Sequence, residues 1–227
     1  MDTHTLTAEL AVRRLVPVVV IDDAADAPGL GRALVAGGLP LAEVTFRTAA
    51  AAEAIAALRD SVPEILVGAG TVLDVATVDV AVASGAQFVV APGFNAEVVD
   101  HCLDRGVPVV PGVSTPTEIE MGLSRGLTLL KFFPAEAAGG LRLLGAMSAP
   151  YRTVRFMPTG GISPSNLPDY LQHPAVLACG GSWLATAPDI AAHRFEQIQR
   201  RTAEAVAVAD SLATPPTADR PLHPSDK

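Results

Sequence analysis

A strand-like run followed by a helix-like stretch recurs eight times along this chain, and this repetition restricts its fold more than any other feature. Apolar, β-branched runs begin every 21–26 residues, and Ala-rich segments of helical composition lie between them. The connections are short, which predicts parallel strands, because each return to the same end of a sheet needs a crossover helix. The eight runs span residues 16–21, 41–47, 65–71, 87–93, 108–114, 129–135, 155–161 and 176–182.

Eight such units predict an α/β fold of the (β/α)8 or TIM-barrel type. An open doubly wound sheet is the alternative, but it would usually show a Gly-rich fingerprint after its first strand, where this chain has Ile21-Asp22-Asp23. We expect a short helix within residues 1–14 and a long final helix over 190–212. A length of 227 residues suits one barrel, so residues 1–213 are predicted to be a single domain. Residues 214–227 are Pro-rich and polar, which predicts a disordered tail.

The net charge, the cysteine count and the lengths of the apolar runs argue against several functional classes. A net charge of −8 argues against a nucleic-acid binder, which would need a basic face. Cys102 and Cys179 have neither disulfide nor metal-ligand spacing, as expected in a reducing cytoplasm. No basic-then-apolar leader opens the chain and no run of about 18 apolar residues occurs, so neither export nor a membrane span is expected. The sequence therefore predicts a cytoplasmic protein that binds no metal.

A lysine interrupts the sixth run. Leu129 to Phe133 reads as a buried strand closed by Pro134, with Lys131 at its centre. A charged ammonium inside such a strand loses much of its hydration energy unless another group compensates. In one interpretation the stem packs while the amine reaches water or pairs with a carboxylate. In the other, a desolvated amine acts as a nucleophile toward a carbonyl.

Polar side chains also stand in the second run, where Glu43, Thr45 and Arg47 occupy alternate positions and therefore one face of the strand. In barrel enzymes, the active site lies at the C-terminal ends of the strands. Arg47 is expected near the mouth and Glu43 deeper, in about the layer of Lys131. Glu43 could then shuttle protons for the lysine, although a purely structural buried ion pair is the alternative. Arg47 offers a fork for a carboxylate, unless it makes only a surface salt bridge.

Glycine pairs follow the last two runs. Gly160-Gly161 precedes an expected helix opening, and Gly180-Gly181 precedes Ser182. Glycines let backbone N–H groups approach an anion closely, and barrels often bind phosphate at the loops after strands seven and eight. A tight turn would explain either pair alone. Two pairs on neighbouring strands predict a phosphate-binding site.

Five motifs together resemble the family of 2-keto-3-deoxy-6-phosphogluconate (KDPG) aldolase and 4-hydroxy-2-oxoglutarate aldolase, and the match runs in order over residues 6–212. Small departures are Phe46 and Ala138, where Leu and Asn would be expected. The motifs are Glu43 to Thr48, Val67 to Val72, Lys131 to Glu136, Pro158 to Ile162, and Gly180 to Trp183.

The resemblance implies a class I aldolase of the Entner–Doudoroff pathway, a homotrimeric barrel with no metal or organic cofactor. It implies that Lys131 is the Schiff-base lysine and Glu43 the general acid/base. Arg47 and Thr71 would hold the keto-acid end of the substrate. The other implied positions are Phe133 and Pro92 as pocket lining, Thr159 near the substrate hydroxyls, and Gly160, Gly161, Gly181 and Ser182 around the phosphate.

The expected reaction is the cleavage of KDPG to pyruvate and glyceraldehyde 3-phosphate, with 4-hydroxy-2-oxoglutarate as a further substrate. Three alternatives stay open. One is an aldolase of the galactonate series. Thr159 argues against it, because such relatives tend to lack this threonine. Another is a non-catalytic barrel that binds a phosphorylated metabolite. The third is a phosphate-barrel decarboxylase, which would need an Asp-x-Lys pair where this chain has Leu129-Leu130-Lys131.

Overall fold

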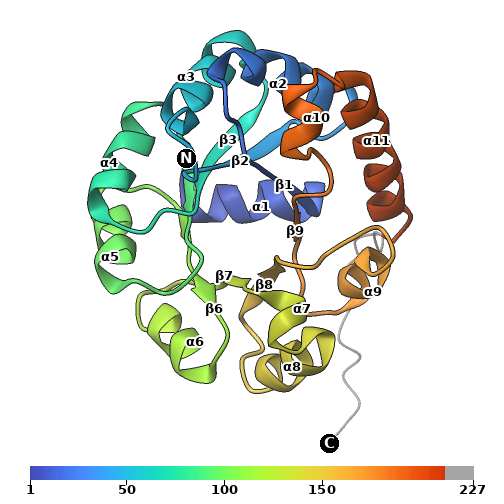
Figure 1. The fold of residues 1–227 in the computed structure, drawn as a ribbon. Helices are drawn as coiled ribbons and strands as arrows, with labels where there is room; N and C mark the ends of the chain where they lie inside the picture. The colour runs from blue at the N-terminus through green and yellow to red at the C-terminus, as the bar shows by residue number, and fades with distance from the viewer. Residues whose placement is uncertain (213–227) are drawn as a thin grey trace, which may run out of the picture.

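Parallel strands curl around a common axis, with helices on the outside, in a computed structural model that describes residues 1–212 (Figure 1). The predicted tail over 214–227 and the last residue of the predicted domain lie outside the described residues. The helix expected at the start of the chain is confirmed as α1 (Thr3–Arg13), capped by the Asp2 carboxylate, which accepts a hydrogen bond from the Thr5 N–H. Within residues 1–212, no helix is long and apolar enough to cross a membrane.

Strands and helices alternate in the predicted order. The strands are β1 (Leu15–Val19), β2 (Leu41–Thr45), β3 (Leu66–Gly70), β4 (Phe88–Val90), β5 (Val109–Val110), β6 (Gly112–Val113), β7 (Leu129–Phe132), β8 (Arg155–Pro158) and β9 (Cys179–Gly181). The remaining helices are η1 (Ala24–Asp26), α2 (Ala27–Ala36), α3 (Ala51–Ser61), α4 (Val75–Ala83), α5 (Ala96–Asp104), α6 (Pro116–Leu123), α7 (Ala135–Ala138), α8 (Gly140–Ser148), α9 (Leu167–Gln172), α10 (Ala187–Ala191) and α11 (Phe195–Ser211).

The strands form two parallel sheets, in the orders β5-β4-β3-β2-β1-β9 and β6-β7-β8. Pro111 separates β5 from β6 within the fifth predicted run, because proline has no N–H to donate to a neighbouring strand. Isolated parallel bridges join Phe156 to Val176 and Thr159 to Gly180, beside β8 and β9. The parallel α/β architecture predicted from the sequence is confirmed.

The long final helix expected over 190–212 is confirmed as α11, but it begins at Phe195 rather than at residue 190. The structure has two helices there, α10 and α11, with His193 between them in the left-handed region (φ 52°). The Ala192 N–H donates to Pro188 O, and the His193 N–H donates to Ile190 O. These tight hydrogen bonds end α10, so its helical path does not continue into α11.

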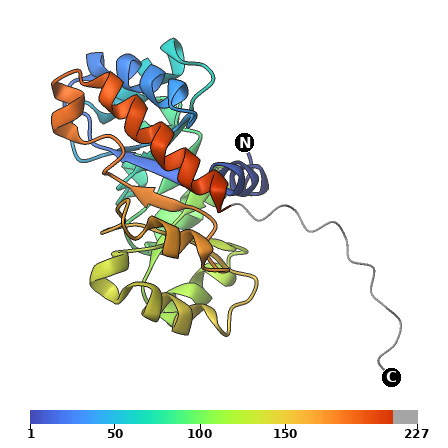
Figure 2. The same cartoon turned by 90° about the vertical axis from the view of Figure 1, so that its right-hand side faces the viewer.

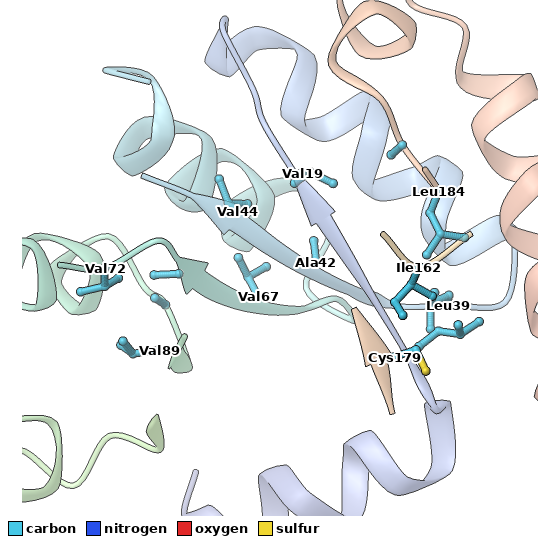
Figure 3. Packing of buried hydrophobic residues seen from close by; sticks show 14 of the residues in the cluster. Val19, Leu39, Ala42, Val44, Val67, Val72, Val89, Ile162, Cys179 and Leu184 are labelled. Carbon is cyan, nitrogen blue, oxygen red and sulfur yellow. The ribbon is translucent and has the colours of Figure 1, made fainter. Parts of the chain in front are cut away.

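The two faces of the strands pack against different groups. Figure 3 shows Val19, Ala42, Val44 and Val67, which are fully buried and belong to one large apolar cluster that extends to the surrounding helices. Every second residue of β2 belongs to this outer cluster, as the period of two along a strand requires. Leu41, Glu43 and Thr45 therefore face the opposite way, toward the axis of the curled sheet.

Helix α1 fills one end of the interior (Figure 2). Leu6 and Leu10 of α1 are buried in a second apolar cluster with Val16, Leu41 and Leu66, which lie at or near the starts of their strands. The polar inward residues come later along the strands. The interior is thus apolar at the N-terminal ends of the strands and polar toward their C-terminal ends.

An acid-sensitive contact joins α10 to α11. The Asp189 carboxylate is 8 % exposed and accepts hydrogen bonds from Thr186 Oγ1 (2.7 Å), Arg194 Nε (2.8 Å) and Arg201 Nη2 (3.0 Å). The Thr186 hydroxyl, and then the two guanidinium groups, lower the pKa of Asp189 from 3.8 to about 2. A lowered pKa in the folded state stabilises the fold above the unfolded pKa of 3.8, and this contribution is lost as the pH falls toward 2.

Asp189→Asn is therefore expected to lower the free energy of unfolding at pH 7 by about 2 kcal/mol. The difference from the unsubstituted chain should shrink between pH 4 and pH 2. Urea unfolding at a series of pH values measures it. A difference that stays constant over this interval would show that the carboxylate charge has no part in it.

Candidate active site

A lysine and a glutamate meet inside the curled sheet, 88 residues apart in the sequence. Lys131 comes from the middle of β7 and Glu43 from the middle of β2, both on the inward face. The Lys131 Nζ–Glu43 Oε1 distance is 3.3 Å, with the lysine side chain 6 % exposed and the glutamate side chain fully buried. The amine therefore does not reach bulk water. It pairs with the carboxylate at the depth that strand alternation predicted.

The neighbouring strand makes room for the Glu43 carboxylate. Gly70 ends β3, and a Cβ atom at this position would lie 2.3 Å from Glu43 Oε1. Any larger residue would push the carboxylate away from Lys131. Glu43 Oε2 has no protein hydrogen-bond partner within residues 1–212. Because a buried carboxylate oxygen is costly without a partner, this atom is available to bind a water molecule or a substrate hydroxyl.

An aromatic ring covers the amine from the mouth of the interior. The Lys131 Nζ lies 5.3 Å from the centroid of the Phe133 ring, within the distance of a cation–π interaction. The predicted placement of Phe133 on the face of Lys131 is thus what the structure shows. An amine held in this way is shielded from solvent, close to a carboxylate and able to reach a carbonyl, as nucleophilic catalysis needs.

Arg47 and Thr71 lie together at the rim. Arg47 follows β2 by two residues and is exposed, and its Nε donates to Thr71 Oγ1 at 3.2 Å. Thr71 adopts a left-handed backbone (φ 57°), which is costly for a β-branched residue. Such strain is found most often where function requires a particular geometry. The contact uses Nε and orients the guanidinium, whose terminal nitrogens can then bind a carboxylate.

A cavity of about 470 Å³ opens beside these groups. Six residues singled out in the sequence line it, namely Arg47, Phe133, Thr159, Gly160, Gly161 and Ser182. Its other lining residues are Val18, Pro134, Glu136, Ala137, Ile162 and Gly180. Residues from distant parts of the chain thus converge on one space at the C-terminal ends of the strands.

Five predicted site residues do not line this cavity. Lys131 lies beside Phe133 and pairs with Glu43, and Thr71 contacts Arg47; Phe133 and Arg47 themselves line the cavity. Gly181 backs onto the indole of Trp183. Pro92 lines a separate cavity of about 310 Å³, although its carbonyl oxygen approaches Gly112, the strand neighbour of Lys131.

The helix expected after Gly160-Gly161 is α9, whose N-cap residue is Asn166. Both glycines are in left-handed conformations (φ 97° and 84°), and a bent segment separates them from α9, which begins at Leu167. Asn166 holds that segment, because its Nδ2 donates to Gly161 O (3.0 Å) and its Oδ1 accepts from the Ser163 N–H (2.8 Å). The glycines therefore form a turn of their own at the edge of the cavity.

The sequence of the chain matches a known enzyme family. The family model described as KDPG and KHG aldolase matches residues 6–201, which is most of the described chain. The chain belongs to the KDPG and KHG aldolase family. A relative from Treponema pallidum (strain Nichols), named 2-dehydro-3-deoxy-phosphogluconate aldolase, is 54 % identical over 185 residues, which are 82 % of this chain and 88 % of the relative.

Two solved structures of aldolases superpose closely. KDPG aldolase from Legionella pneumophila, with pyruvate captured at low pH as a covalent carbinolamine intermediate, has a TM-score of 0.85 and 38 % identity and covers 88 % of this chain and 97 % of its own. The 2-keto-3-deoxy-6-phosphogluconate aldolase of Zymomonas mobilis ZM4 with 3-phosphoglycerate has a TM-score of 0.85 and 40 % identity, over 94 % of this chain and 100 % of its own.

Glu136 is the cavity-lining residue that the sequence analysis passed over. It ends the motif from Lys131 to Glu136, but its spacing does not show which loop it contacts. A signal that points to it is its position five residues after Lys131, in helix α7, which begins three residues after the end of β7. Within residues 1–212, no three His, Cys, Asp or Glu side chains converge in the manner of a metal site.

Proposed function

We propose that this chain is a class I aldolase, a carbon–carbon lyase that cleaves KDPG to pyruvate and glyceraldehyde 3-phosphate through a Schiff base on Lys131. The observation that carries the proposal is the Lys131 amine, buried 3.3 Å from the Glu43 carboxylate under a cavity in a chain of this family. The Legionella relative, whose pyruvate is bound as a covalent carbinolamine, supports it, because a carbinolamine precedes the Schiff base.

The reaction divides into steps that these residues can perform. Glu43 takes a proton from the Lys131 ammonium, and the free amine adds to the C2 ketone of the substrate. Glu43 returns this proton to the carbinolamine hydroxyl, which leaves as water and gives an iminium that acts as an electron sink. Glu43, through a water molecule, then accepts the C4 hydroxyl proton. The C3–C4 bond breaks, glyceraldehyde 3-phosphate leaves, and the remaining enamine is protonated at C3. Water finally releases pyruvate and regenerates the amine.

The remaining site residues bind the ends of the substrate. Arg47, oriented by Thr71, binds the C1 carboxylate, and Thr159 lies near the hydroxyls. Phe133 and Pro92 exclude water from the reacting carbons. The phosphate binds at the glycine turn and β9, through the N–H groups of Gly160, Gly161 and Gly181 and the hydroxyl of Ser182. Because the chain itself supplies the nucleophile and the acid/base, the reaction needs no metal or organic cofactor.

The proposed protein is one (β/α)8 domain over residues 1–213. Closure of the two sheets into one eight-stranded barrel is supported by β5 and β6, which flank Pro111, and by the bridges beside β8 and β9. We place the enzyme in the cytoplasm as a homotrimer, on the strength of the family resemblance. Sedimentation of the purified chain tests the trimer.

The family description includes KHG, which is another name for 4-hydroxy-2-oxoglutarate. This compound, which yields pyruvate and glyoxylate, is therefore a second proposed substrate. Pyruvate release, followed with lactate dehydrogenase, compares it with KDPG and the galactonate epimer of KDPG. The proposal expects the highest kcat/KM with KDPG. A higher value with the epimer would move the chain to the galactonate series, and no release from any of the three would favour a non-catalytic binding barrel.

Gly161→Ala tests the phosphate turn. A Cβ at this position would lie 2.6 Å from both Cβ and Cγ of Glu136, and φ is 84°. The substitution is expected to displace the turn and raise KM for KDPG by about tenfold or more, with about 1–3 kcal/mol lost from the stability of the fold.

Gly106→Ala is the matched control for this variant. Gly106 also has a positive φ (65°), but a Cβ there would meet nothing within 4 Å. It carries the same backbone penalty without the steric clash, and it lies after α5. Its KM should equal that of the unsubstituted enzyme. Equal KM values for the two variants would show that the turn at Gly161 does not bind the phosphate.

A further inference from the structure

Glu136 places a carboxylate in the wall of the cavity that is proposed to hold the phosphate of the substrate. Among its lining residues, all within residues 1–212, it alone carries a carboxylate. Two like charges close together repel each other, even where solvent screens them in part. A binding site for a phosphate must therefore keep this carboxylate away from the anion.

The backbone of Glu136 is fixed to the glycine turn. Its N–H donates to Gly160 O at 3.0 Å, and the Ala135 N–H donates to Thr159 O at 2.8 Å. The Cβ and Cγ atoms of Glu136 pack directly against Gly161, where there is no space for another side chain. The first part of this side chain thus belongs to the cavity wall, and the direction of its carboxylate decides which charge the cavity presents.

A tyrosine on helix α9 holds the carboxylate on the far side of the wall. Tyr170 of α9 is buried, and its hydroxyl donates a hydrogen bond to Glu136 Oε1. Figure 1 shows α7 and α9 on the same side of the fold. The same oxygen lies 3.0 Å from the place that a Cβ on Gly140 would occupy. Glu136, Gly140 and Tyr170 line a different cavity of about 450 Å³, so the carboxylate is turned toward that space.

The hydroxyl is suited to be a permanent donor. Burial, and then the hydrogen bond to Glu136, raise the pKa of Tyr170 well above its usual value of 10. The phenol therefore keeps its proton at physiological pH and donates it to the carboxylate. With the hydroxyl removed, the Glu136 carboxylate loses this partner and is free to rotate back toward the turn.

We propose that Tyr170 is a positioning residue that gives the cavity its affinity for a phosphorylated substrate, by holding the Glu136 carboxylate toward Gly140 and away from the turn at Gly160 and Gly161. This inference rests on the proposed function, because it concerns the phosphate of the same substrate. It adds an electrostatic element to the proposed phosphate contacts, which are otherwise backbone N–H groups and the Ser182 hydroxyl.

Tyr170→Phe removes the hydroxyl and keeps the ring that packs in the core. It is expected to raise KM for KDPG about three- to tenfold, since the freed carboxylate repels the phosphate in a partly screened site. The rate at which borohydride traps pyruvate should not change, because pyruvate carries no phosphate. A second substitution, Glu136→Gln in the Tyr170→Phe background, should bring KM back toward the original value.

Tyr151→Phe is the matched control. Tyr151 is the other tyrosine in the chain; its hydroxyl donates to Glu120 at 2.9 Å, and it lines a different cavity. Its removal should leave KM unchanged. A merely structural role for Tyr170 predicts that KDPG cleavage and pyruvate trapping decline together and that Glu136→Gln gives no recovery. A joint decline, a lack of recovery, or an unchanged KM in Tyr170→Phe would overturn the inference about Tyr170 and leave the proposed function standing. Failure to trap pyruvate in the unsubstituted chain would overturn the proposed function as well.

Discussion

Lys131→Arg is expected to abolish cleavage of KDPG, with kcat reduced by about 10⁴-fold or more, as for the loss of other catalytic nucleophiles. Arginine keeps a positive charge opposite Glu43, which is fully buried. Its guanidinium stays protonated and cannot add to a ketone. The loss therefore isolates the nucleophile from the charge, and pyruvate release measures it.

The choice of arginine keeps this test independent of folding. Lys131→Ala would leave the Glu43 carboxylate buried and uncompensated, which is expected to cost about 3–5 kcal/mol of stability. A neutral pair, Lys131→Met with Glu43→Gln, avoids that cost and should be folded and equally inactive. Circular dichroism and urea unfolding report the fold in each case. Full aldol activity in either variant would contradict the assignment.

Glu43→Gln is expected to lower kcat by about 10²–10⁴-fold, the usual contribution of a positioned general acid/base. The amide keeps the shape of the side chain beside Gly70 but cannot accept the amine or hydroxyl proton. Because the Lys131 amine remains, pyruvate should still be trapped by borohydride, though more slowly. Retention of adduct formation with loss of turnover would distinguish proton transfer from nucleophilic attack.

Thr45→Val is the matched control on the same strand. Thr45 is buried, points inward like Glu43, and its hydroxyl donates to Val19 O at 2.9 Å. Loss of this hydrogen bond should lower stability by about 1 kcal/mol and leave kcat nearly unchanged. If Glu43→Gln were as active as Thr45→Val, the Lys131–Glu43 contact would be a structural ion pair only.

The strands could be predicted from the sequence because their apolar runs are short, separated by helix-forming stretches and closed by turn residues. Their ends could not. The run 87–93 contains β4 only over Phe88–Val90, since Ala91 to Gly93 already belong to the following loop. Likewise the fifth run is split at Pro111. Hydropathy does not distinguish a buried strand end from the buried loop residue beside it.

The inner part of the site was predictable and the outer part was only partly so. Alternation along β2 and β7 puts Glu43 and Lys131 on one face, and the register of parallel strands gives them similar depth. The left-handed Thr71 and the hydrogen bond from Tyr170 to Glu136 depend on how loops and helices pack. No periodicity in the sequence carries that information.

The most direct test of this account is to trap the enzyme with pyruvate and borohydride and to map the adduct by mass spectrometry. The chain has two lysines, Lys131 and Lys227, so few sites compete. Trypsin should no longer cut after a modified Lys131, and the peptide from Gly126 to Arg142 should carry one reduced pyruvate. Lys227→Arg should give the same adduct. An adduct that is absent, or that persists in Lys131→Arg, would contradict the Schiff-base mechanism.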